Sequence, residues 1–361
     1  MDVAPCSVSA DAVWREIQSG ALQMSREESE FLSEVGGNDL LNGILHETIF
    51  RWQTMLEALA ALLASKLGSE MSPSYQWRPV LYSAFVKGSS VLGIPIQDLI
   101  VNDIKAIKER DPACPSLAHA FLFFKGFHGI EVHRAANWLW RNQRKSLASL
   151  LQSRVSEIFG MDIHPAAQLG SSIMIDHATG VVIGETTKLG DGCTLLHGVS
   201  LGGNGKQQGD RHPKLGMNVL VGAGASILGN VVIGNGAKIG ASAVVLTDIP
   251  AFATAVGCPA KVIGRVKEDN PASALDHSYN SVNLKSQSNG PLFSRLSGLV
   301  DGHGFSDQLQ NICGLEVPKE EAMALFFEQQ RRSLDSHSRK HLNEAETRRI
   351  QYGAPACVCS T

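Results

Sequence analysis

The 361-residue sequence contains no long apolar run. Its longest, Ala58 to Ala64, is far shorter than the roughly 20 residues that a membrane-spanning helix needs. The first residues, MDVAPCSVSADAVWREIQ, lack a basic segment followed by an apolar one, so we predict no secretory signal. A net charge of −3 gives no basic surface for nucleic acid or for an anionic membrane. We therefore expect a cytoplasmic protein with neither a membrane nor a nucleic-acid partner.

Cysteine is also sparse. The seven cysteines are scattered and odd in number, and no two pairs have the spacing of a zinc knuckle. In a chain of this length they indicate reduced thiols rather than a disulfide framework, and we predict no metal site. What the chain does have is 43% hydrophobic residues, the content of a folded globular protein with room for two domains.

Residues 1–160 have the periodicity of helices. Apolar residues recur at three- and four-residue intervals from Leu41 to Leu63. Asp39 precedes this pattern as an N-cap and Gly68 follows it as a stop, which predicts one helix. Similar patterns predict helices over 77–92, 98–110 and 116–159. The sequence therefore predicts an all-helical N-terminal domain over residues 1–160.

After Gly160 the period changes to six. Thirteen aliphatic residues lead successive six-residue units: Ile163, Leu169, Ile175, Ile183, Leu189, Leu195, Leu201, Leu215, Val221, Ile227, Ile233, Ile239 and Val245. Two irregularities interrupt the series, a slip of two residues after Ile175 and a gap of 14 residues from Leu201 to Leu215. Neither a helix nor a flat hairpin sheet has a period of six. The pattern predicts a left-handed parallel β-helix over 161–268, whose leaders stack inside.

The regular pattern ends in the segment PAFATAVGCPAKVIG, where Pro250 and Pro259 interrupt strand pairing. Beyond it the composition shifts to Ser, Asn, Gln and Gly, and then to a charged stretch. We predict a largely flexible C-terminal extension over 269–361, with one amphipathic helix at KEEAMALFFEQQRRSL. The predicted fold class is therefore α+β: a helical domain, a solenoid and a tail.

Polar residues at unusual places in the six-residue units are candidates for chemistry. Asp176 and His177 follow the leader Ile175, where most units have glycine. Asp162 comes directly before the first leader, and the two-unit spacing favours a place near the same edge as His177. The ordinary alternatives are a solvated corner for His177 and a helix-junction cap for Asp162, and both remain open.

Two further candidates lie outside the regular units. Arg211 and His212 fall in the 14-residue gap, where a loop can carry them over a neighbouring groove. Asp111 ends a predicted helix, where a negative charge is unfavourable by about 0.3–1 kcal/mol. Lys108 and Arg110 offset that cost in a purely structural interpretation, which also remains open.

Five stretches together resemble the serine O-acetyltransferase family: RDPAC, DIHPAAQLG, IDHATGVVIGET, LGGNGKQQGDRHPK and VGCPAKVIG. The resemblance covers about residues 98–264 and is weaker in the preceding helices. It implies transfer of acetyl from acetyl-CoA to L-serine in cysteine biosynthesis. It also implies homotrimers paired into a hexamer, with active sites between neighbouring solenoids, and feedback inhibition by L-cysteine.

The resemblance assigns a role to each candidate. His177 is the general base, because a neutral histidine suits proton transfer near neutral pH, and Asp162 orients it. Arg211 and His212 bind the serine carboxylate, and Asp111 and Asp176 bind its ammonium group.

The same resemblance implies a coenzyme A groove between solenoids. Five residues are candidates for binding it: Gly203, Asn204, Ala223, Ala241 and Lys261. Small residues permit the backbone to approach the pantetheine arm closely. This chain has Asn204 where the family usually has threonine, which puts a contact through the threonine methyl in doubt.

Other functions remain open at this stage. One is a hexapeptide acetyltransferase for a sugar, an antibiotic or homoserine, although Arg211 and Asp111 together favour a zwitterionic acceptor. Another is a solenoid carbonic anhydrase that binds a metal through three of His164, His177, His197 and His212. A third concerns binding: members of the family often insert a C-terminal isoleucine into O-acetylserine sulfhydrylase. Because this chain ends in ACVCST, we predict that this complex is weak or absent.

Overall fold

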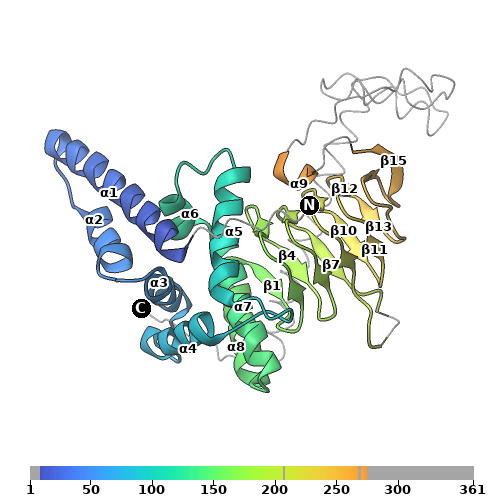
Figure 1. Ribbon diagram of the computed structural model, residues 1–361, viewed down its shortest axis with the longest axis horizontal. Coiled ribbons are helices and arrows are strands. Elements are labelled where there is room, and N and C mark those ends of the chain that lie inside the picture. The colour runs from blue at the N-terminus through green and yellow to red at the C-terminus, as the bar shows by residue number, and fades with distance from the viewer. Residues whose placement is uncertain (1–8, 206–207, 267–269, 275–361) are drawn as a thin grey trace, which may run out of the picture. The chain divides into compact units, whose positions relative to one another are not determined.

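The computed structural model of the chain describes residues 9–205, 208–266 and 270–274, all in one compact unit. The predicted C-terminal extension, including its amphipathic helix, lies outside the described residues except for the short helix α9 (Pro271–Ala274). The helices before the solenoid are α1 (Ala10–Val35), α2 (Leu40–Leu45), α3 (Met55–Leu67), α4 (Ser74–Lys87), α5 (Ile96–Arg110), α6 (Leu117–Phe123), α7 (Lys125–Arg141) and α8 (Lys145–Phe159) (Figure 1). No helix in these described segments is long and apolar enough to cross a membrane.

The prediction of a single helix from Leu41 to Leu63 is wrong. A π-helical turn (His46–Phe50) follows α2, and the helix is then broken before α3 begins. The cause is a capping box: Thr54 accepts a hydrogen bond from the backbone of Glu57, whose side chain accepts one from the backbone of Thr54. This local cap starts a new helix within an apolar pattern that continues across the break.

Other helix boundaries also differ from the predicted ones: α4 begins at Ser74 rather than at Trp77, and the predicted helical stretch 116–159 consists of α6, α7 and α8. The helix α4 ends at Lys87 rather than at the predicted residue 92, because the backbone of Gly88 is extended. The helix α5 begins at Ile96, directly after Pro95 and two residues before the predicted start, so Asp98 lies in its first turn.

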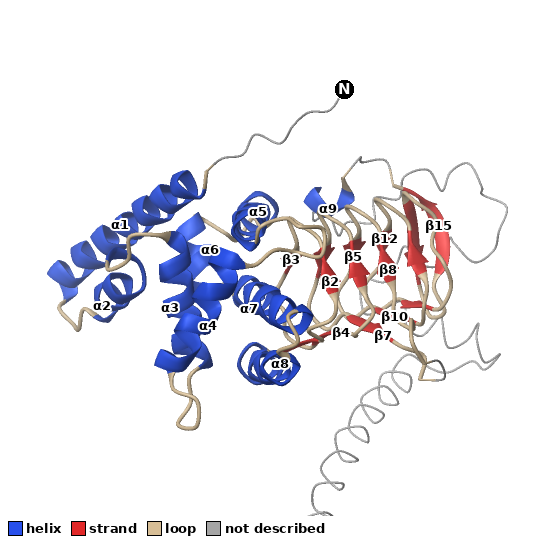
Figure 2. Cartoon of the chain, turned by 60° about the horizontal axis from the view of Figure 1, so that its bottom comes forward, coloured by secondary structure: helices blue, strands red, loops and turns tan. Residues whose placement is uncertain are grey.

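The predicted solenoid is confirmed, and its strands form three sheets that are parallel except for the last strand of the third (Figure 2). The first sheet consists of β1 (Met161–Ile163), β4 (Val181–Ile183), β7 (Ser200–Gly202), β10 (Ser226–Leu228) and β13 (Val244–Val245). The second consists of β2 (Gln168–Leu169), β5 (Lys188–Leu189), β8 (Lys214–Leu215) and β11 (Val232–Ile233). The third consists of β3 (Met174–Ile175), β6 (Thr194–Leu195), β9 (Leu220–Val221), β12 (Lys238–Ile239), β14 (Ala253–Val256) and β15 (Lys261–Arg265).

All thirteen leaders are buried, as their period predicts. The 14-residue gap does not disturb the register. Ile183 pairs with Leu201, 18 residues later, and Leu201 pairs with Ile227, 26 residues later. The difference of eight residues is the length of chain extruded as a loop, after which the coil resumes in phase. The parallel coils end where β15 pairs antiparallel with β14, inside the predicted terminal segment.

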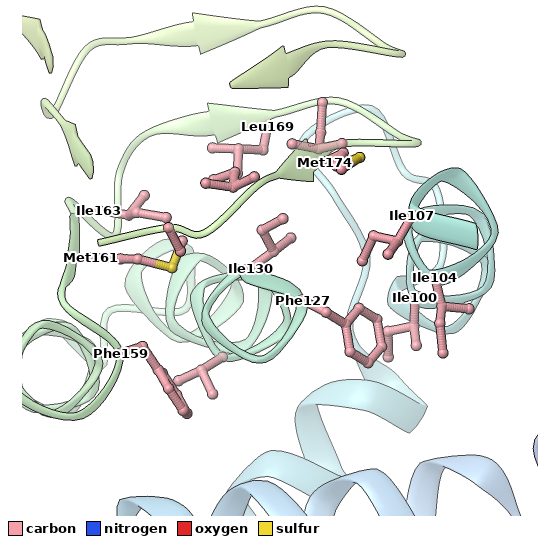
Figure 3. Packing of buried hydrophobic residues seen from close by; sticks show 14 of the residues in the cluster. Ile100, Ile104, Ile107, Phe127, Ile130, Phe159, Met161, Ile163, Leu169 and Met174 are labelled. Atoms are coloured by element: carbon pink, nitrogen blue, oxygen red, sulfur yellow. The ribbon is translucent and has the colours of Figure 1, made fainter. Parts of the chain in front are cut away.

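Helices α5, α7 and α8 close the β1 end of the solenoid (Figure 3). Phe127 and Ile130 of α7 lie in one apolar cluster with Met161 of β1 and Met174 of β3. These contacts remove the open end of the first coil from water, so that the helices and the solenoid share a core.

A polar seam runs through the same junction. Arg134 of α7 donates to Oδ2 of Asp103 and to the carbonyl of Gly170, and Asp103 accepts a hydrogen bond from the backbone of Ile173. Glu131 is fully buried beside this pair, with its Oε2 3.6 Å from Nε of Arg134, and neither carboxyl oxygen has a hydrogen-bond partner among the described residues. Burial raises the pKa of Glu131 well above its usual value.

Candidate active site

His177 lies in a widened corner of the solenoid. The corner joins β3 of the third sheet to β4 of the first sheet, and eight residues separate the leaders there instead of six. His177 and the next residue, Ala178, both have left-handed backbones, with φ of 55° and 60°. Such a conformation costs about 1–2 kcal/mol for a residue other than glycine, so the surrounding structure must hold it. The two-residue slip in the sequence is therefore this turn.

The N-terminus of α7 packs directly against the turn. A Cβ atom on Gly126 would lie 2.0 Å from the carbonyl oxygen of Ile175, so no residue with a side chain fits there without movement. The next contact is polar: the ammonium group of Lys125 donates to Oγ1 of Thr179. Through these two residues the helical part of the chain supports the turn that carries His177.

The side chain of His177 is 72% exposed, as a base that meets a substrate must be. Its Nε2 lies 3.5 Å from Oδ2 of Asp176, which is 82% buried. The ring of His197, from the next coil, packs edge-on against it at a centroid distance of 5.6 Å. Asp162 is engaged elsewhere, because its Oδ1 accepts a hydrogen bond from Gln152 of α8. In the described residues of one protomer, the carboxylate beside His177 is thus that of Asp176.

The edge that carries His177 continues along the solenoid. The backbone of Gly224 donates to the carbonyl of His197, and that of Ser242 donates to the carbonyl of Ala223. Ala223 and Ala241 therefore occupy the corners of the next two coils on the same edge. The corner after β14 lies there too, since Val244 donates to Gly257, and exposed Lys261 follows it. His177, Ala223, Ala241 and Lys261 are thus arranged in this order along one edge.

Arg211 and His212 lie at a different edge, where the chain passes from β7 of the first sheet to β8 of the second. Arg211 forms an ion pair with Glu185, with Nη2 3.1 Å from Oε2. His212 is buried, and its Nδ1 accepts a hydrogen bond from the backbone of Thr186. Burial, together with the charge of Arg211, lowers the pKa of His212. A neutral ring at this place offers Nε2–H as a donor.

Gly203, at the start of the 14-residue gap, lies beside Arg211, near its end. A Cβ atom on Gly203 would lie 3.3 Å from Cγ of Arg211. Exposed Asn204 is its neighbour in the same loop. Gly203 and Asn204 therefore share the edge of Arg211 and His212, and not the edge of Ala223 and Ala241.

Asp111 is the C-cap of α5 and accepts a hydrogen bond from the backbone of Ala113. The preceding residue, Arg110, is buried against the third sheet, where it donates to the carbonyls of Ser172 and Gly192. The end of α5 is therefore fastened to the coils that carry Asp176 and His177.

Sequence reasoning missed Glu185 and Thr186, which hold Arg211 and His212. Both stand in the stretch IGET directly after the leader Ile183, so a polar pair next to a leader was the available signal. It also missed Lys125 and Gly126, for which the sequence offers no signal, since their contacts are with residues more than 45 positions away.

Within the described part of the chain, no group of three or more His, Cys, Asp and Glu side chains is arranged to hold a metal ion. The four histidines of the carbonic anhydrase alternative divide between the two edges: His177 and His197 lie at one, and His164 and His212 lie at the other.

A helical region, a hexapeptide solenoid and polar residues at its edges define an acyltransferase of the hexapeptide-repeat class. Residues 13–132 match the family model described as serine acetyltransferase, N-terminal, and residues 212–247 match the model described as bacterial transferase hexapeptide (six repeats). Serine acetyltransferase 2 of Arabidopsis thaliana is 40% identical over 293 residues, which cover 79% of this chain and 86% of the relative. The chain belongs to the serine acetyltransferase family.

Solved structures agree with this membership. Serine acetyltransferase of Brucella abortus in complex with coenzyme A has a TM-score of 0.64 at 39% identity, over 70% of this chain and 96% of that one. Soybean serine acetyltransferase complexed with serine has a TM-score of 0.65 at 42% identity, over 72% and 100%. A serine acetyltransferase in complex with cysteine has a TM-score of 0.67 at 40% identity, over 73% and 97%.

Proposed function

We propose that this protein transfers the acetyl group of acetyl-CoA to the hydroxyl of L-serine, giving O-acetyl-L-serine and coenzyme A. The observation that carries the proposal is the widened corner, which presents exposed His177 beside Asp176 at one end of an edge that leads past Ala223 and Ala241. Family membership supplies the substrate class, since relatives have been solved with coenzyme A and with serine.

In the proposed mechanism, the serine hydroxyl attacks the thioester carbonyl directly. A new C–O bond forms and the C–S bond breaks, while His177 takes the hydroxyl proton and then gives it to the departing thiolate. A positioned base of this kind contributes about 10²–10⁴-fold in rate. Asp162 or Asp176 then serves to orient the ring and to stabilise its charged form, as carboxylates beside catalytic histidines do.

The serine zwitterion needs partners for both of its charges. Arg211 and the Nε2–H of His212 suit the carboxylate, because a guanidinium fork binds two oxygens and a neutral imidazole donates one hydrogen bond. Asp111 and Asp176 suit the ammonium group. The attachment of Arg110 to the solenoid supports this role for Asp111, because it holds the end of α5 against the coils of the site.

The active site in this proposal lies between protomers. Its two groups of residues stand at separate edges of one solenoid, with the first sheet between them. A heterologous contact between neighbouring copies brings one edge of each protomer to the other edge of the next, and such contacts close into rings. We propose a homotrimer, paired into a hexamer through the helical domains. Asp162, which lies on the first sheet, is then available to a neighbouring copy.

Acetyl-CoA would lie along the edge formed by Ala223 and Ala241, with Gly203 and Asn204 contributed by the neighbouring copy and Lys261 near the nucleotide phosphates. Small side chains at the corners favour close approach to backbone groups. L-Cysteine, which resembles serine in shape and charge, would occupy the serine subsite as an inhibitor, and the solved complex of a relative with cysteine supports this.

The decisive experiment is an acetyl-CoA assay with L-serine, L-homoserine and simple sugars, run beside His177→Ala. We expect serine to be strongly preferred and the variant to lose about 10²–10⁴-fold in turnover. Equal use of the other acceptors, or near-normal turnover by His177→Ala, would contradict the proposal. Stoichiometric zinc lost together with activity would favour the carbonic anhydrase alternative instead.

Binding of O-acetylserine sulfhydrylase is predicted to be weak or absent. Assembly of the two proteins with nanomolar affinity would contradict that prediction.

A further inference from the structure

We propose that Thr186 is a positioning residue for the serine carboxylate: its backbone N–H holds His212 as the Nε2–H tautomer, and its hydroxyl fixes the backbone that carries Arg211 and His212. The inference rests on the proposed function for its kinetic consequence. The tautomer of His212 does not depend on the proposed function.

The hydroxyl of Thr186 lies within hydrogen-bonding distance of both Arg211 and His212. Oγ1 accepts hydrogen bonds from the backbone N–H groups of Arg211 and His212, each at 3.1 Å. It also lies 2.9 Å from Nδ1 of His212. A threonine hydroxyl has two acceptor lone pairs and one donor hydrogen. Because both lone pairs are occupied by N–H donors, the hydroxyl acts as a donor toward any further partner, and the acceptors in reach are Nδ1 of His212 and the carboxylate of Asp210.

A backbone donor at the same nitrogen makes the tautomer assignment independent of the hydroxyl. The backbone N–H of Thr186 lies 3.2 Å from Nδ1 and can act only as a donor. Nδ1 of His212 is therefore an acceptor and carries no proton. In a neutral imidazole the proton then resides on Nε2, for which the described residues provide no partner. This leaves one N–H free to donate to a ligand oxygen.

The ring is also restricted sterically. A Cβ atom on Gly184 would lie 2.0 Å from Cδ2 of His212, so the ring rests in the space that this glycine leaves. Burial lowers the pKa of His212, with the charge of Arg211 acting in the same direction. Glu185 opposes these effects, while Lys214 and His164 add to them. A ring held between Gly184 and the backbone donor at Nδ1 is consistent with a neutral donor at Nε2.

The chain provides a matched control at the adjacent position. Thr187 is buried, and its hydroxyl has no hydrogen-bond partner among the described residues. Thr186→Val and Thr187→Val are the same isosteric change, one residue apart. Only the first removes hydrogen bonds to the loop that carries Arg211 and His212. Thr186→Ser keeps the hydroxyl and removes only a methyl group.

The experiment measures KM for serine, KM for acetyl-CoA and kcat for the three variants. We expect Thr186→Val to raise the serine KM about 10- to 100-fold, since up to three hydrogen bonds are lost, with a small change in the acetyl-CoA KM. Thr186→Ser and Thr187→Val should remain near the wild type. A serine KM within twofold of wild type for Thr186→Val, or an equal rise in Thr186→Ser, would overturn the inference.

A spectroscopic measurement separates this inference from the proposed function. In ¹⁵N-histidine-labelled protein, with His212→Asn to assign the resonance, the wild-type ring should show the Nε2–H tautomer. Because the backbone N–H of Thr186 remains in Thr186→Val, this variant should show the same tautomer, and an Nδ1–H tautomer in the wild type would refute the assignment. If His177→Ala remains active, the proposed function is contradicted. The role of Thr186 in orienting His212 is still supported in that case if the tautomer is as expected.

Discussion

His177 and Arg211 stand at the two edges of the same sheet. His177 lies in the corner by which the chain enters the first sheet at β4, and Arg211 lies in the loop by which it leaves that sheet after β7. Two groups that are proposed to act on one serine molecule are thus separated within each protomer. Mixtures of variants at these two positions therefore test whether one site takes His177 and Arg211 from different protomers.

At a serine concentration well below the KM, co-expressed His177→Ala and Arg211→Ala chains should be more active than either variant by itself. If each site takes His177 from one protomer and Arg211 from its neighbour, random mixing leaves about a quarter of the sites with both residues intact. Activity is measured after co-purification with two different tags. A mixture of two His177→Ala chains with the same tags is the control. Recovery no greater than in that control would place both residues in a site within one protomer.

Arg211→Ala should raise the KM for serine far more than the KM for acetyl-CoA. Loss of a charge-assisted hydrogen bond costs about 1.5–3 kcal/mol, which corresponds to roughly 10- to 150-fold in the serine KM. Glu185→Gln, which removes the ion-pair partner of Arg211 but leaves the guanidinium, should have a smaller effect. Equal increases in both KM values for Arg211→Ala would argue against a specific role at the carboxylate.

Gly126→Ala should impair the turn that carries His177. The added Cβ would meet the carbonyl oxygen of Ile175, and overpacking of this kind costs about 1–3 kcal/mol. We expect a lower melting temperature and a kcat that falls more than the KM values change.

The matched control for this substitution is Gly43→Ala, because Gly43 also lies in a helix but has open space around its Cβ position. This variant should be neutral or more stable by up to about 1 kcal/mol, since alanine favours helices over glycine. Differential scanning fluorimetry and steady-state kinetics on both variants check the pair. If Gly126→Ala behaves like Gly43→Ala, then α7 does not support the turn.

Glu131→Gln should change how stability depends on pH. Burial raises the pKa of Glu131 in the folded protein above the value of about 4.3 that an unfolded chain has. The unfolded chain therefore releases this proton first, and the free energy of unfolding falls as the pH rises from there toward the raised pKa. The variant has no proton to lose, so it should gain stability relative to wild type between pH 5 and pH 8.

Urea unfolding at several pH values measures this difference. Glu34→Gln, on the exposed surface of α1, should retain the pH dependence of the wild type. The same slope in wild type and Glu131→Gln would mean that the buried carboxyl does not titrate as its environment predicts.

Much of the fold could be predicted because the solenoid is a local repeat. Each leader is buried by the leaders of the coils next to it, so a period of six in the sequence is sufficient to specify the coil. The helical part was less predictable. A capping box at Thr54 starts a new helix although the apolar pattern continues across the break. The spacing of apolar residues does not reveal where such a cap ends one helix and begins the next.

The sequence by itself determined the coil, its phase and the position of its irregularities. The eight residues of extra chain and the two-residue slip are both visible as departures from the period, and both carry candidate residues, Arg211 and His177. Only the tertiary structure decided where these departures lie in space. They fall at different edges of one sheet, one of them supported by Gly126 and the other by Thr186. The physical reason is that a repeat specifies contacts between neighbouring coils, whereas the contacts of Gly126 and Thr186 join segments whose separation in the chain follows no period.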